Sequence, residues 1–116
     1  MPNVLGQFQL ENISTAIALV RTLNIGIENE HIQRGITKIN SLARLQEIKS
    51  GKLKDLIKNN KLIIDGSHNE DGARVLNEYL QTLKCNKHVV IGMMANKNHE
   101  KYISYFKDIS TLTTID

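Results

Sequence analysis

A short apolar run that stops in a cluster of small and polar residues constrains the fold of this chain more than any other stretch. Leu62 to Ile64 are continuously apolar, as is typical of a strand covered on both faces, and Gly66 permits backbone conformations that larger residues resist. After Asn69, apolar residues recur at helical spacing at Ala73, Leu76, Leu80 and Leu83. The pattern predicts a buried strand, a polar loop and a helix. Because ligands bind at the carboxyl ends of strands in open α/β sheets, this loop is the first candidate for a functional site.

The remaining apolar patterns extend this fold in both directions along the chain. The predicted elements are helices over 13–23 and 28–39, strands over 42–48 and 88–94, a helix over 102–109 and a strand over 111–116. From Leu62 onward the order is strand, helix, strand, helix, strand. Right-handed crossovers then predict an α/β fold, a Rossmann-like and mostly parallel sheet with flanking helices. The first two helices alone cannot bury both of their apolar stripes, so they need something to pack against.

The composition and charge exclude several classes of protein. The 116 residues are 41% hydrophobic and 23% charged, which indicates a globular chain and not a disordered one. Much of the net charge of +3 lies in a lysine run over 49–61, which we interpret as a solvated turn, because no aromatic residues interleave it for base stacking. No apolar stretch approaches the ~20 residues that span a bilayer, and no leader is recognised. The single Cys85 excludes an internal disulfide. We therefore expect a reducing cytoplasm, with no nucleic acid and no membrane as partner.

The loop after the central strand carries the polar residues of greatest interest. Asp65 is placed to accept hydrogen bonds from ribose hydroxyls, or equally to cap the following turn. His68 is suited to binding a carboxylate or transferring a proton, although a simple hydrogen-bonding role is the more common one. Asn69, Glu70 and Asp71 resemble a helix cap and an acidic first turn. Two carboxylates there repel phosphate, so a nucleotide would place its sugar here and its phosphates elsewhere.

Three further residues are candidates outside that loop. Arg44 is the natural phosphate ligand, because guanidinium forms forked contacts with anionic oxygens, unless it is an exposed strand residue. Lys97 either meets a substrate carboxylate or begins a helix, and Asn12 either contacts a base or sugar or caps the first helix. The chain has no G-x-x-x-x-G-K-[ST], no G-x-S-x-G and no metal-ligand spacing. The motifs therefore predict no complete active site, no catalytic residue and no metal site.

Four segments, taken together and in order, resemble those of a known family. They are residues 6–12 (GQFQLEN, followed by Ala16) for the family's G-x-H-Q-x-x-N-A, 43–46 (ARLQ) for G-R-L-Q, 65–69 (DGSHN) for D-G-A-H-N-P, and 92–98 (GMMANKN) for G-x-x-x-D-K-D. Along essentially its whole length the chain resembles the C-terminal part of folylpolyglutamate synthase/dihydrofolate synthase, a Mur-ligase-type enzyme that forms amides. In that family ATP phosphorylates a folate or pteroate carboxylate, and the amine of an amino acid attacks the acyl phosphate.

The resemblance implies roles for the candidate residues. Asn12, Arg44 and Asp65 would contact ATP, and His68 would help to place the incoming glutamate, with Lys97 nearby. This agrees with the independent interpretation of Arg44 as a phosphate contact and of Asp65 as a ribose contact. The implied cofactors are ATP and Mg²⁺, and the implied partners are ATP, folate or dihydropteroate, and glutamate.

The resemblance also implies a division of the chain. Residues 1–40 correspond to the helical tail of the family's central ATP-binding domain, and 41–116 to a truncated C-terminal α/β domain. The family's P-loop, magnesium ligands and modified lysine belong to an N-terminal domain that these residues do not include. We therefore expect a ligase fragment that is inactive by itself.

The chain departs from the family pattern at several places, and two other functions stay open. Phe8 stands where histidine is usual, Ala43 where glycine is, Glu70 where proline is, and Asn96 and Asn98 where aspartates are. One alternative is a non-catalytic module that binds a partner chain, possibly the polypeptide of the missing N-terminal half. The other is a fragment of a different Mur-type amino acid ligase, because a shared fold does not fix the acceptor.

Overall fold

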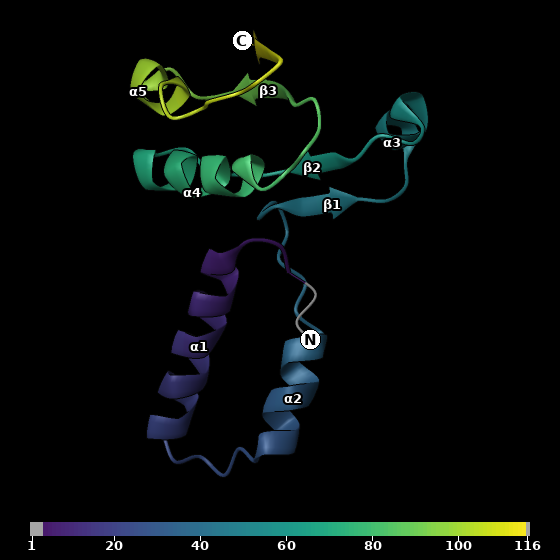
Figure 1. Ribbon diagram of the computed structural model, residues 1–116. Coiled ribbons are helices and arrows are strands. Elements are labelled where there is room, and N and C mark those ends of the chain that lie inside the picture. The colour runs from purple at the N-terminus through teal and green to yellow at the C-terminus, as the bar shows by residue number, and fades with distance from the viewer. Residues whose placement is uncertain (1–3, 116) are drawn as a thin grey trace. The chain divides into compact units, whose positions relative to one another are not determined.

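The computed structural model describes residues 4–115, which divide into two compact units, the first ending at Asp65 and the second beginning at Gly66 (Figure 1). The first unit contains α1 (Gln7–Thr22), α2 (Asn29–Thr37), β1 (Gln46–Ile48), α3 (Lys52–Ile57) and β2 (Leu62–Ile64). The second contains α4 (Glu70–Gln81), β3 (His88–Gly92), α5 (His99–Ile103) and β4 (Thr111–Ile115). The predicted α/β class is confirmed. Asp116, the last residue of the predicted final strand, lies outside the described residues. No helix within 4–115 is both long and apolar enough to cross a membrane.

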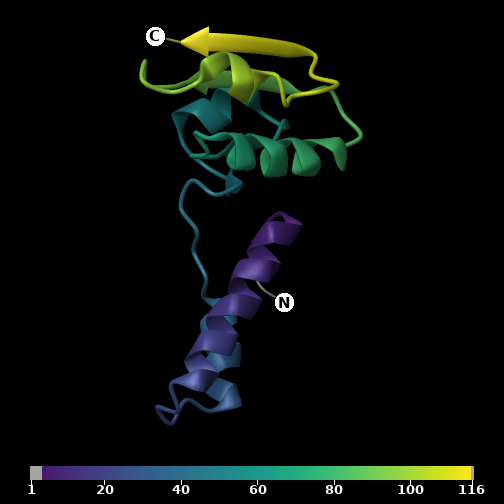
Figure 2. The ribbon, with the colours of Figure 1, turned by 90° about the vertical axis from the view of Figure 1, so that its left-hand side faces the viewer.

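The two N-terminal helices form a helical hairpin within the first unit. In both views α2 returns alongside α1 after the connecting loop (Figures 1 and 2). Asn24 (φ 47°) and Gly26 (φ 70°) lie in that loop in the left-handed region, a conformation that ends a helix. A capping box between Glu28 and His31 begins α2, because each side chain accepts a hydrogen bond from the backbone of the other residue.

The lysine run differs from its predicted form. Part of it is helix α3, which begins after Gly51, and not a simple turn. Within this segment Lys54 Nζ donates hydrogen bonds to the carbonyl oxygens of Lys58 and of Asn60, the latter at 2.9 Å. These bonds satisfy carbonyls that lie just beyond Ile57, the last residue of the helix. At least one lysine of the run therefore has a structural role.

The strand predicted over 42–48 is shorter than expected. Hydrogen-bonded pairing begins only at Gln46, and β1 pairs with β2 in the antiparallel direction, with Gln46 opposite Ile64 and Ile48 opposite Leu62. Ala43 (φ 50°) and Leu45 (φ 49°) adopt left-handed backbone that a strand cannot contain. The alternation of apolar and polar residues in 42–45 therefore belongs to a loop.

The second unit contains the parallel pairing that the sequence predicts. β3 and β4 pair in parallel, with His88 opposite Thr111 and Gly92 opposite Ile115, and α5 lies in the connection (Figure 2). The described strands thus make two sheets of two strands each, and not one continuous sheet. Ile64 of β2 is 43% exposed and Val90 of β3 is 66% exposed. The expectation of strands covered on both faces is therefore wrong for these strands as described, because a two-stranded sheet has few neighbours to cover it.

The buried core is small in both units. The buried apolar residues are Leu45 in the first unit and Ala73 and Tyr102 in the second, and Gln9 is a buried polar residue. α5 ends at Ile103, earlier than predicted. Beyond its end, the ring of Phe106 packs edge-on against the ring of Tyr102, with 5.4 Å between the ring centroids. On α1, Leu19 is 61% exposed. The expectation that the helix pair leaves apolar surface uncovered is confirmed.

We expect Gly6→Ala to destabilise the first unit by about 2 kcal/mol. Gly6 has φ +87°, and a Cβ there would lie 2.6 Å from the Phe8 ring and 2.9 Å from Cδ1 of Leu45. Gly26→Ala is the matched control, because Gly26 (φ +70°) has no atoms within 4 Å of the added carbon. It should cost only the backbone penalty of about 1 kcal/mol. Urea unfolding of both variants measures the difference, and equal losses would contradict the close packing at Gly6.

Candidate functional site

Arg44 extends from a loop whose two neighbouring residues are both left-handed. The Ala43 amide donates to Oε1 of Gln46 at 2.9 Å, and the Leu45 amide donates to Oδ2 of Asp65 at 2.9 Å. The Leu45 side chain is 1% exposed, whereas Arg44 is exposed. The loop is therefore fixed on both sides of Arg44, and the guanidinium is available to an anion in solvent.

The first motif lies against this loop. Gly6, the N-cap of α1, approaches the Leu45 side chain closely, and Nε2 of the buried Gln9 donates to Oγ of Ser41 at 3.3 Å. Asn12 is exposed in the second turn of α1. The alternative that Asn12 caps the helix is wrong, because α1 begins at Gln7.

Asp65 connects the third motif to the second. Its carboxylate is half-buried and accepts from the Leu45 amide, 20 residues earlier in the chain. The sequence suggested a ribose contact or a turn cap for Asp65, and neither interpretation included a bond to the Arg44 loop. The structure therefore brings parts of three predicted motifs together in the first unit.

The loop over 66–69 begins the second unit and leads into α4. Asn69 Oδ1 accepts from the Gly72 amide at 2.9 Å, so the predicted cap is confirmed, and Glu70 and Asp71 form the acidic first turn. His68 Nδ1 lies 3.2 Å from the Gly66 carbonyl oxygen, within hydrogen-bond distance, and the ring is exposed. This is the local hydrogen bond of the simpler interpretation, and it leaves the ring at the surface.

The fourth motif meets that loop through α5. Lys97 is half-buried in the turn after β3, where its amide donates to the Met94 carbonyl at 3.0 Å. Asn98, and not Lys97, precedes the helix as its cap and accepts from the Lys101 amide at 3.1 Å. Tyr102 Oη and Ser67 Oγ then share a hydrogen bond of 2.7 Å. The second unit thus contains His68 and Lys97, and the loops that carry them are joined through Tyr102.

Sequence reasoning missed three residues that organise these loops. Gln46 was only a motif letter, yet its side chain accepts from the Ala43 amide. Tyr102 was only the first residue of a helix predicted from apolar spacing, and Ser67 was given no role. A hydroxyl on an otherwise apolar face was the one available signal, because a buried tyrosine usually bonds through its hydroxyl.

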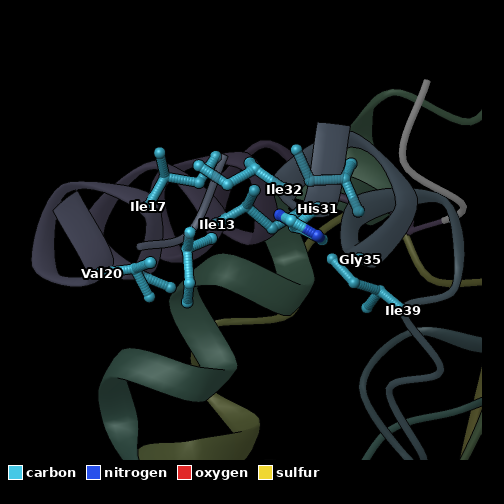
Figure 3. Close-up of a pocket in the computed structure, with 10 residues that line it drawn as sticks. Ile13, Ile17, Val20, His31, Ile32, Gly35 and Ile39 are labelled. Carbon is cyan, nitrogen blue, oxygen red and sulfur yellow. The ribbon is translucent and has the colours of Figure 1, made fainter. Parts of the chain in front are cut away.

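Each unit also contains a cavity. A groove of about 320 Å³ lies between α1 and α2 and is lined chiefly by aliphatic side chains, among them Ile13, Ile17, Val20, Ile32 and Ile39, with His31 as a polar member (Figure 3). A second cavity of about 400 Å³ lies in the second unit beside Ile91, Met93 and Tyr102. Neither cavity is lined by a predicted site residue.

Within 4–115, no group of three or more His, Cys, Asp or Glu side chains is placed to hold a metal ion. The Glu70 carboxylate at the start of α4 forms an ion pair with Lys101. Glu70 Oε1 lies 2.8 Å from Lys101 Nζ, and Glu70 Oε2 accepts from the Tyr105 hydroxyl at 3.3 Å. The Glu70 charge is therefore partly neutralised.

Several solved synthases share this fold. The fold is that of folylpolyglutamate synthase from Thermotoga maritima (TM-score 0.77, 21% identity, 98% of this chain and 26% of that one) and of a ligand-free bifunctional folylpolyglutamate synthase/dihydrofolate synthase from Yersinia pestis (0.75, 22%, 97% and 25%). A bifunctional synthase of the same name, solved with Mn, AMPPNP and L-glutamate bound, matches with a TM-score of 0.76, 22% identity, and coverage of 97% and 25%.

A curated protein is similar in sequence as well. A probable bifunctional folylpolyglutamate synthase/dihydropteroate synthase of Haloferax volcanii is 25% identical over 115 residues, which is 96% of this chain and 12% of that protein. No protein-family model matches the chain. The resemblance to the C-terminal portion of folylpolyglutamate synthase is confirmed. The chain spans about an eighth of the curated relative and about a quarter of the solved structures.

We expect the Glu70–Lys101 pair to contribute stability that is lost at alkaline pH. A hydrogen bond to Glu70 and the charge of that carboxylate raise the pKa of Lys101. A raised pKa means that the contribution is complete below the unfolded-state pKa of about 10.4 and disappears as pH rises through the higher folded-state value. The contribution should be small and weaken with salt, because Lys101 is exposed.

Thermal unfolding between pH 9 and 12 measures this effect in wild type and in Lys101→Met. The wild type should lose an additional increment of stability above about pH 10.4 that the variant lacks. Lys84→Met is the control, because Lys84 is also exposed in the second unit and forms no ion pair among the described residues. Parallel pH profiles for wild type and Lys101→Met would show that the ion pair does not form in solution.

Proposed function

We propose that this chain supplies part of the binding surface of an ATP-dependent folylpolyglutamate or dihydrofolate synthase, which joins glutamate to a folate or pteroate carboxylate. The observation that carries the proposal is the fixed loop that presents Arg44, found in a fold shared with folylpolyglutamate synthases. A solved structure of that fold binds Mn, AMPPNP and L-glutamate, which supports ATP, a divalent metal and glutamate as ligands. The same names support the folate branch over other amino acid ligases.

In this proposal the first unit contacts the nucleotide through Asn12 and Arg44, and Asp65 either contacts the ribose directly or supports the Arg44 loop. The guanidinium of Arg44 is exposed, and its planar fork suits phosphate oxygens. When bound, ATP supplies the phosphoryl group that activates the substrate carboxylate as an acyl phosphate. The cationic side chain of Arg44 binds the negatively charged phosphate oxygens, and the side-chain amide of Asn12 hydrogen-bonds to the base or sugar.

The second unit contributes His68 and Lys97 toward glutamate. An ammonium and an imidazole both donate to carboxylate oxygens. Because Lys101 pairs with Glu70, the carboxylate of Glu70 competes less strongly for Lys97 or for the substrate amine. Neither residue is assigned a covalent or proton-transfer step.

The proposal includes the domain division expected from the resemblance. Residues 1–40 are the helical tail of the ATP-binding domain, and 41–116 belong to the C-terminal α/β domain. These residues do not catalyse ligation by themselves, because they contain no phosphate-binding G-x-x-x-x-G-K-[ST]. Mg²⁺ is held by residues outside them, and the reaction takes place in the cytoplasm.

We expect Arg44→Gln to weaken Mg-ATP binding by about ten-fold or more, because a charge-assisted hydrogen bond is lost. Isothermal titration of the purified chain measures the affinity, and circular dichroism checks that each variant is folded. Arg34→Gln is the matched control, since Arg34 is also exposed in the first unit and the change in net charge is the same. An equal loss of Mg-ATP affinity in both variants would mean that ATP responds only to the net charge of the chain and does not contact Arg44 specifically. If the folded wild-type chain binds no Mg-ATP, the proposal that it retains a nucleotide-binding surface is wrong.

A second candidate function is the binding of a partner segment in the groove between α1 and α2. The groove is apolar and open, and it runs along a helix pair that leaves large aliphatic side chains exposed. The proposed occupant is the P-loop-bearing part of the ligase, whether it is covalently continuous with this chain or a separate polypeptide. This candidate makes the chain a module that completes an enzyme.

We expect Ile17→Asp to abolish association with that part, because binding would have to bury a carboxylate among mostly aliphatic side chains. The P-loop-bearing part of the Thermotoga maritima relative is the test partner, and size-exclusion chromatography with light scattering measures association. Ser14→Asp places the same charge on the exposed side of α1 as a control. A wild-type chain that stays monomeric beside this partner would rule out the candidate.

A further inference from the structure

We infer that Asp65 and Gln46 are positioning residues that hold Arg44 in place by accepting hydrogen bonds from the backbone amides on either side of it. What Arg44 binds rests on the proposed function. The positioning itself rests on the geometry of the loop, in which Ala43 N donates to Gln46 and Leu45 N donates to Asp65, each at 2.9 Å.

The loop needs such support because its backbone is unfavourable. Ala43 and Leu45 have φ of 50° and 49°, a region that residues with a Cβ seldom occupy. Two such residues flanking one arginine persist only where surrounding contacts enforce them. The buried Leu45 side chain is one such contact, and the two side-chain acceptors are the others.

The strand register explains why Asp65 reaches the Leu45 amide. In the antiparallel ladder Gln46 lies opposite Ile64, so the next pair outward along the same register is Leu45 with Asp65. The left-handed turn at Leu45 takes its backbone out of the ladder. The Asp65 carboxylate therefore supplies the acceptor for an amide beyond the end of the strand pairing, and the amide is not left unsatisfied.

The consequence for Arg44 is reduced conformational freedom at its own backbone. A residue between two anchored amides loses fewer backbone conformations when its side chain binds an anion. Asp65 and Gln46 thus increase affinity without touching the ligand. A direct ribose contact by Asp65 makes a different prediction, because it depends on the ligand and not on the loop.

Amide hydrogen exchange of the ligand-free chain, followed by NMR, separates these roles. In Asp65→Ala the Leu45 amide should exchange at least ten-fold faster than in wild type. Asp65→Asn should restore much of the protection, because the carboxamide oxygen is still an acceptor. Asp55→Ala removes the same charge from exposed α3 and should leave the Leu45 amide unchanged. In Gln46→Ala the Ala43 amide should likewise exchange faster than in wild type. This variant tests the loop if Asp65→Ala fails to fold.

Mg-ATP titration of the same variants completes the test. Positioning predicts that affinity follows Leu45 protection, so that Asp65→Asn binds nearly as well as wild type and Asp65→Ala binds at least ten-fold more weakly. Loss of binding in Asp65→Asn with the Leu45 amide still protected would overturn the inference in favour of direct contact. Unchanged Leu45 exchange in Asp65→Ala would also overturn it. If the Leu45 amide responds as expected and wild type binds no ATP, positioning stands and the proposed nucleotide contact fails.

Discussion

The hydrogen bond from the Leu45 amide to the Asp65 carboxylate determines how the first unit can present a functional side chain. It connects the end of β2 to the start of β1, where the chain turns out of the sheet. Because the Leu45 side chain is buried against Gly6, the same turn also fixes the start of α1. One strained residue therefore joins three segments that are distant in sequence, and Arg44 gains its fixed exposure from that junction.

The small core makes such individual bonds more important than they would be in a larger domain. Leu45 is the one buried apolar side chain described in the first unit, and Ala73 and Tyr102 have that role in the second. With so little apolar area removed from water, turns depend on side-chain to backbone bonds to stay ordered. Gln46, Asn69 and Asn98 all accept from backbone amides. These residues adjoin the loops that carry the candidate site.

The sequence predicted what depends on local periodicity and failed where distant contacts decide. The helices α1, α2 and α4 follow from apolar spacing, and the Asn69 cap follows from its position before an acidic turn. The left-handed Ala43 and Leu45 could not be read from residues that alternate like a strand. Asp65 was correctly singled out, but its partner is 20 residues away, so only the register of β1 against β2 identifies it. Which predicted residues contact a ligand stays a prediction.

The substitution of glutamate for proline at position 70 illustrates how a departure from a family pattern can be accommodated locally. Proline at the first helical position costs nothing because that amide needs no partner, and glutamate there gains from the helix dipole. The added negative charge would weaken any anion site at the start of α4 if it stood alone. Lys101 and Tyr105 both contact the Glu70 carboxylate, so part of that charge is neutralised within the second unit. Charge balance at this helix end is therefore compatible with a carboxylate ligand near His68 and Lys97, even though the proline is absent.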